Sequence, residues 1–198
     1  MTIVSKEQLP AFAREVLARV SSAGDPAEET RAFVIALQGD LGSGKTTFMQ
    51  AFAHELGVEE TVQSPTYVLM KTYPIRTSAF GELLCCGAPL APAPYQKSTS
   101  SSQASPRLAF HPNAEVLPPS RVFMKLVHID AYRLDDPKEF SALKPEQFLQ
   151  DPHALVCIEW PERLVGVLPS PDLVLKFSSE GMKEGGREIE IAEKNGTI

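Results

Sequence analysis

The feature that most constrains this sequence is a glycine-rich stretch between an apolar run and a helix-like segment. The stretch, Gly39-Asp-Leu-Gly-Ser-Gly-Lys-Thr46, fits the pattern G-x-x-x-x-G-K-[ST]. The apolar run over 32–37 is typical of a buried strand, and apolar residues at helical spacing over 45–56 predict a helix that stops at Gly57. A strand, a glycine loop and a helix in this order predict a site for phosphate groups.

Each position of the motif has a predicted role at the phosphates of a nucleotide. Lys45 is expected to neutralise the β- and γ-phosphates, Thr46 to offer its hydroxyl to Mg²⁺, and Thr47 to contact the α-phosphate. The glycines allow backbone N–H groups to turn inward. The predicted nucleotide-binding loop therefore comprises Gly39, Asp40, Leu41, Gly42, Ser43 and Gly44. The alternative is a turn that only caps a helix, and the flanking strand and helix argue against it.

Two carboxylates that follow predicted strands are candidates for holding the metal and positioning a water. Asp130 follows a strand expected over 122–129, and Glu159 follows an apolar strand expected over 154–158. The alternative is that both are solvated loop acids. Thr66, between the helix and the next strand, is a candidate γ-phosphate sensor, with a simple turn as the equal alternative.

Aromatic and histidine residues near these acids are ambiguous from spacing alone. Tyr132 and Trp160 can stack on a base or anchor a partner, but large aromatics are more often core residues, and that interpretation is favoured here. His128 is interpreted as a strand residue, because no ligand-like grouping of histidines accompanies it. The sequence therefore predicts no zinc site.

The remaining segments predict an alternation of helices and strands. Apolar spacing predicts a helix over 9–20, and short helices are expected over 137–143 and 145–149. Runs of β-branched and aromatic residues predict strands over 67–73 and 122–129 as an antiparallel hairpin, and over 172–177 and 187–192 as a terminal pair.

One long segment interrupts this pattern between the two hairpin strands. Residues 76–120 contain seven prolines, seven serines and five charged residues in 45 positions, without a sustained apolar period. Such a composition cannot bury enough apolar surface to offset the entropy of ordering. We therefore expect a disordered insertion at a hairpin tip, within one domain over 1–198.

Composition narrows the class of protein. The net charge is −6, from 25 acidic and 19 basic residues, so the chain is not expected to coat nucleic acid, and any RNA contact would need a local basic patch or a partner. No apolar run approaches the roughly 20 residues of a membrane helix, and the N-terminus lacks a signal peptide's apolar centre. The three cysteines form neither a disulfide framework nor a metal motif. These features predict a cytoplasmic protein without membrane contact.

Four blocks in order, GDLGSGKTT, SPTY, HIDAYRL and IEWPERLVGVLP, closely resemble the bacterial TsaE family, the ATPase of tRNA threonylcarbamoyladenosine biosynthesis. The resemblance covers nearly all of the chain outside 76–120, where the family usually has a short turn. It implies an α/β fold: a P-loop NTPase-like three-layer sandwich with a mostly parallel central sheet and antiparallel additions.

The resemblance also implies ATP and Mg²⁺ as cofactors. ATP turnover would serve a heterodimer of the threonylcarbamoyl transferase subunit and its paralogous partner, which modifies adenosine 37 of tRNAs that read codons beginning with A. Contact with tRNA would be indirect. Residue roles carry over at matching positions: Lys45 and Thr46 at the phosphates and Mg²⁺, Thr66 as the switch threonine, Asp130 and Glu159 as the acids for hydrolysis and metal, and Trp160 beside the nucleotide.

Three rival functions share a phosphate-binding loop. A small-molecule kinase normally has a lid with several arginines, whereas beyond residue 150 this chain has only Arg163 and Arg187. A regulatory GTPase would need N-K-x-D and D-x-x-G motifs, and the sequence contains neither. A non-hydrolysing nucleotide-binding module stays open, because the presence of two acids does not establish their geometry.

Overall fold

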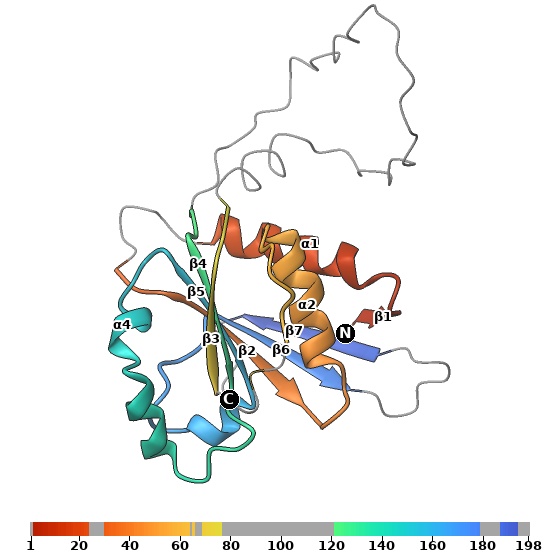
Figure 1. Cartoon of the computed structure of the whole chain (residues 1–198). Helices are drawn as coiled ribbons and strands as arrows, with labels where there is room; N and C mark the ends of the chain where they lie inside the picture. The colour runs from red at the N-terminus through yellow and green to blue at the C-terminus, as the bar shows by residue number, and fades with distance from the viewer. Residues whose placement is uncertain are drawn as a thin grey trace, which may run out of the picture.

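The computed structural model describes residues 2–23, 30–63, 65, 69–76, 121–178 and 187–193 (Figure 1). Thr66 and nearly all of the segment 76–120 lie outside these residues, so the predictions made for them stay predictions. Within the described part of the chain, no helix is long and apolar enough to cross a membrane.

A seven-stranded mixed sheet forms the centre of the molecule, which confirms the predicted α/β class. Its strand order is β1-β7-β6-β2-β5-β4-β3. The strands are β1 (Thr2–Val4), β2 (Phe33–Gly39), β3 (Met70–Pro74), β4 (Lys125–Asp130), β5 (Ala154–Glu159), β6 (Leu173–Ser178) and β7 (Arg187–Glu193). The four central strands β6, β2, β5 and β4 run parallel, and β3, β7 and β1 pair antiparallel at the two edges.

Helices cover both faces of this sheet. On one face lie α1 (Leu9–Ser22) and α2 (Lys45–Glu55), and on the other lie η1 (Pro137–Leu143), α4 (Glu146–Leu149) and η2 (Pro161–Leu164) (Figure 1). Alternate residues of β2 and β5 enter two separate cores, Ile35 and Cys157 on the α1–α2 face and Val34 and Val156 on the other. Burial on both faces explains why these strands are almost continuously apolar.

Aromatic packing anchors the helix that follows the glycine loop. The Phe48 ring lies 5.4 Å from Phe52 on the same helix, 5.9 Å from Phe12 of α1 and 5.7 Å from Phe177 of β6, measured between ring centroids. Such pairs add about 0.5–1.5 kcal/mol each beyond the apolar area they bury. The start of α2 is therefore held in place by the larger of the two cores.

Most predicted elements are confirmed, and the differences have physical reasons. Strand β4 begins at Lys125 rather than 122, because Val122 and Met124 are exposed and the Met124 backbone N–H bonds the His153 carbonyl outside the sheet ladder. Strand β1 was not expected, since three residues are too few for a period to show. Directly after Trp160 lies the short helix η2, which has Pro161 in its first turn.

Candidate functional site

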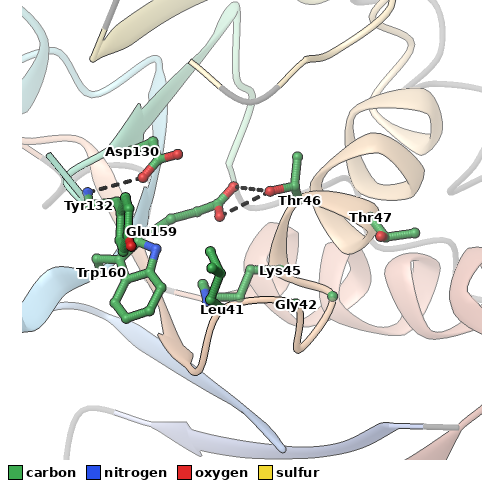
Figure 2. Close-up of a pocket in the computed structure, with 10 residues that line it drawn as sticks. Leu41, Gly42, Lys45, Thr46, Thr47, Asp130, Tyr132, Glu159 and Trp160 are labelled. Atoms are coloured by element: carbon green, nitrogen blue, oxygen red, sulfur yellow. Dashed lines mark hydrogen bonds between the residues drawn. The ribbon is translucent and has the colours of Figure 1, made fainter. Parts of the chain in front are cut away.

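Three parallel strands end at the same edge of the sheet and bring the candidate residues together. Strand β2 ends at Gly39, β4 at Asp130 and β5 at Glu159, and the strand register pairs Glu159 with both Leu37 and Asp130. Ligands of open α/β sheets bind at this carboxyl edge. A pocket of about 240 Å³ lies there, lined by Leu41, Gly42, Gly44, Lys45, Thr46, Thr47, Asp130, Tyr132, Glu159 and Trp160 (Figure 2).

The glycine loop depends on its glycines at two positions in particular. A Cβ atom on Gly39 would lie 2.2 Å from the Phe177 carbonyl oxygen, so only glycine allows β2 to pass this close to β6. Gly44 has a φ of +100° and directly precedes α2, and its missing Cβ leaves room for the Arg187 guanidinium. The loop geometry is therefore specified by residues without side chains.

Lys45 is buried beneath the loop, with 4% of its surface exposed. Its Nζ donates to the backbone carbonyls of Gly39 at 2.6 Å and Asp40 at 2.9 Å and lies 4.1 Å from the centre of the Trp160 ring. Burial lowers the pKa of the Lys45 ammonium below its ordinary value, although nearby carboxylates, Glu159 foremost, oppose this shift. A desolvated cation with only partial charge compensation favours an anionic ligand.

Glu159 forms the opposite side of the pocket and contacts the start of α2. The Thr46 hydroxyl lies 3.1 Å from each Glu159 carboxylate oxygen and donates to them (Figure 2). Glu159 Oε1 also lies 2.9 Å from His128 Nε2 on β4. Glu159 is 2% exposed and Asp130 is 3% exposed. The interpretation of the two acids as solvated loop residues is therefore wrong.

Asp130 and the two aromatic residues complete this side of the pocket. The Tyr132 backbone N–H donates to Asp130 Oδ1 at 3.1 Å, and the Tyr132 ring lies 5.0 Å from that of Trp160 (Figure 2). Tyr132 is 38% exposed, so the core interpretation is wrong for it, and Trp160 is half-buried. Trp160 has a φ of +61°, a left-handed conformation that costs a non-glycine residue energy and is concentrated at functional sites.

The structure gathers most of the predicted site residues. Six predicted loop and helix residues line the pocket, namely Leu41, Gly42, Gly44, Lys45, Thr46 and Thr47, whereas Gly39 does not line it and contributes through its carbonyl, which accepts from Lys45 Nζ. Asp40 likewise acts through its carbonyl, whereas Ser43 is buried and does not line the pocket. Thr47 points away from Glu159 (Figure 2).

Sequence reasoning missed three contacts: Tyr132 in the pocket lining, His128 on Glu159, and Arg187 beside Gly44. The HIDAYRL block placed Tyr132 and His128 close to Asp130, but only the strand register shows what each touches. Among the described residues no group of three or more His, Cys, Asp or Glu side chains could hold a metal by itself. The Thr46 hydroxyl and the carboxylates of Asp130 and Glu159 are oxygen ligands of the kind that Mg²⁺ prefers. Mg²⁺ commonly adds waters and phosphate oxygens to so few protein ligands.

The fold and the pocket define an α/β protein with a candidate nucleotide site at the carboxyl edge of its parallel strands. A sequence model of the family described as "Threonylcarbamoyl adenosine biosynthesis protein TsaE" matches residues 3–83 and 112–189. The chain belongs to the TsaE family, as its motifs indicated.

Two relatives by sequence agree with this assignment. The chain is 25% identical over 166 residues to the tRNA threonylcarbamoyladenosine biosynthesis protein TsaE of Haemophilus influenzae, covering 83% of this chain and 73% of that protein. It is 24% identical over 159 residues to the protein of the same name from Borreliella burgdorferi, covering 80% of each. A crystal structure of Bacillus subtilis YdiB superposes with a TM-score of 0.44 at 20% identity, over 91% of this chain and 77% of that one.

Proposed function

We propose that this chain is a single P-loop NTPase-like domain that binds ATP with Mg²⁺ in the pocket and hydrolyses it. The observation that carries the proposal is the placement of Lys45 and Thr46 opposite the buried Glu159 in one pocket. One side supplies a cation and a helix N-terminus, which suit phosphates, and the other supplies carboxylates, which suit a metal and a water.

The polar groups of the pocket have internal hydrogen-bond partners that phosphates can replace. Lys45 Nζ donates hydrogen bonds to two backbone carbonyls of the loop. Bound β- and γ-phosphates would replace these neutral acceptors with charged oxygens, which form stronger hydrogen bonds with an ammonium group. Thr46, Glu159 and Asp130 would hold Mg²⁺, which would offset charge on the phosphates when bound. Glu159 and Asp130 would then orient the attacking water, and Trp160 would lie beside the nucleotide.

We further propose that turnover serves tRNA modification in the cytoplasm. Membership of the TsaE family and the names of the relatives support a role in tRNA threonylcarbamoyladenosine biosynthesis. In this role the chain is an accessory ATPase for a transferase heterodimer that modifies adenosine 37, and it performs no transfer itself. A net charge of −6 agrees with tRNA being held by the partners.

Phosphoryl transfer to a small molecule is less well supported. Among the described residues that line the pocket, Lys45 is the one cationic side chain. A kinase needs additional positive charge that closes over the transferred group.

The experiment that tests the proposal measures ATP hydrolysis by the purified protein with and without the transferase heterodimer, beside GTP and Lys45→Ala controls. We expect ATP-selective turnover that the heterodimer stimulates and that Lys45→Ala abolishes. Trp160 is the single tryptophan of the sequence, so its fluorescence reports nucleotide binding separately from turnover. If the chain binds ATP but hydrolyses none under any of these conditions, the assignment as an ATPase is wrong and the chain is a nucleotide-binding regulatory module.

A further inference from the structure

We propose that His128 is a positioning residue that holds the Glu159 carboxylate through its Nε2–H and thereby controls turnover but not nucleotide affinity. The proposal rests on the proposed ATPase function, because it takes Glu159 as an acid of hydrolysis. It concerns a residue that does not line the pocket and that lies two positions before Asp130 on β4.

The strand register places His128 on the same side of the sheet as the acids. His128 pairs with Cys157, and Asp130 pairs with Glu159, across the parallel strands β4 and β5. Because side chains two residues apart on a strand share a face, these four side chains share one face of the sheet. This is the face that α1 and α2 cover, so His128 lies beneath the start of α2, where Thr46 approaches Glu159.

The geometry of the contact supports the assignment of the imidazole proton to Nε2. His128 is fully buried, and its Nε2 lies 2.9 Å from Glu159 Oε1. In the proposed contact the Glu159 carboxylate oxygen accepts and the Nε2–H of His128 donates. Among the described residues Nδ1 is buried without a hydrogen-bond partner, and in the neutral Nε2–H tautomer this nitrogen carries no hydrogen. That tautomer therefore leaves no buried donor unpaired.

The contact matters most when nucleotide and metal are bound. In the structure the Thr46 hydroxyl and His128 both bond Glu159. If the Thr46 hydroxyl turns to the metal, as proposed, His128 is the side chain that continues to fix the carboxylate. Groups that orient a metal-site carboxylate from behind typically change metal affinity or activity about 10- to 100-fold when they are removed.

Two substitutions separate positioning from packing. His128→Met fills the space of the imidazole with an unbranched apolar side chain but removes the Nε2–H donor. His128→Gln keeps an N–H donor that can reach the position of Nε2. Because His128 is fully buried and outside the pocket lining, neither change removes a group that contacts nucleotide. The matched controls are His54→Met and His54→Gln, since the His54 side chain is 85% exposed on α2.

For His128→Met we expect kcat to fall about 10- to 100-fold with the nucleotide Kd, read from Trp160 fluorescence, within about threefold of wild type. His128→Gln should recover most of the lost kcat, and the His54 variants should match wild type. Equal losses in His128→Met and His128→Gln, or an unchanged kcat in His128→Met, would overturn the proposal, as would a loss confined to Kd.

A measurement on the free wild-type chain keeps the proposal testable if a variant does not fold or if no ATP is hydrolysed. In ¹⁵N-histidine NMR spectra, His128 should show the Nε2–H tautomer, and Glu159→Ala should shift its Nε2 resonance but leave that of His54 in place. An Nδ1–H tautomer, or no response to Glu159→Ala, would refute the contact. Absence of turnover with the expected spectrum would instead count against the ATPase function alone.

Discussion

The pocket has two walls that are built in different ways. The loop wall, residues 39–47, is one continuous stretch whose shape comes from glycine backbone, and it presents Lys45 and the start of α2. The acid wall consists of Asp130, Tyr132, Glu159 and Trp160, which come from the ends of two strands and are aligned by the register of β4 and β5. The loop wall suits binding of phosphate and the acid wall suits turnover, so substitutions should separate the two properties.

The largest effect on binding is expected from Lys45→Ala in the loop wall. Removal of the buried cation leaves phosphate charge uncompensated, and we expect ATP affinity to fall about 100-fold or more in isothermal titration. Lys125→Ala is the matched control, because Lys125 begins β4 at the end away from Asp130 and pairs with Asp151. If the ATP affinity of Lys45→Ala stays within about threefold of wild type, the loop wall is not the phosphate-binding side of the pocket.

Glu159→Gln in the acid wall should have the opposite profile. The amide can keep a hydrogen bond from Thr46 but loses the negative charge, so kcat should fall about 100-fold while ATP affinity changes about threefold at most. Steady-state kinetics combined with equilibrium binding measure both quantities. Glu146→Gln, on the exposed surface of α4, should leave both unchanged. A parallel loss of ATP affinity and kcat in Glu159→Gln would show that phosphate binding and turnover do not separate between the two walls.

Gly44→Ala, in the loop wall, should have a smaller effect than Lys45→Ala or Glu159→Gln. We expect it mainly in the thermal stability of the chain. Alanine at a φ of +100° costs about 1–2 kcal/mol, and its Cβ would lie 2.8 Å from the Arg187 guanidinium. We expect the melting temperature to fall by about 2–8 °C. Gly42→Ala has a similar φ, +80°, but open space around the added Cβ, so its fall should be smaller. Adding Arg187→Ala to Gly44→Ala should raise the melting temperature to that of Gly42→Ala, because the contact with the guanidinium is removed. If the melting temperature does not rise, backbone strain at residue 44 alone accounts for the loss of stability.

The two walls also differ in how far sequence reasoning could predict them. The loop residues belong to one motif with its own local geometry, so the gathering of most of them at the pocket followed from spacing alone. Gly39 and Asp40 contribute only through carbonyls that bind Lys45, and Ser43 does not line the pocket. The positions of Asp130 and Glu159 were predicted from strand ends, but their burial and the His128 contact depend on a register between strands 29 residues apart. Tyr132 was misassigned to the core because exposure is a property of the folded edge, which no spacing encodes.

The smallest effect is expected from residues 77–120, which join the sheet at its other end. Strands β3 and β4 pair Pro74 with Lys125, and the Ile75 backbone N–H donates to the Met124 carbonyl at 3.0 Å, so the chain leaves and re-enters the described structure side by side. Lys125 lies at the opposite end of β4 from Asp130, about 17 Å along the strand.

Replacing residues 77–120 with a short Gly/Ser bridge should therefore change the melting temperature by no more than about 2 °C and leave ATP affinity and kcat intact. Thermal unfolding and the same kinetic assays test this, with the Gly44→Ala chain as a reference for a detectable loss of stability. A larger drop in melting temperature would show that the segment contributes to the folded core. A change in kcat at constant stability would instead connect it to the acid wall, since β4 joins the two ends.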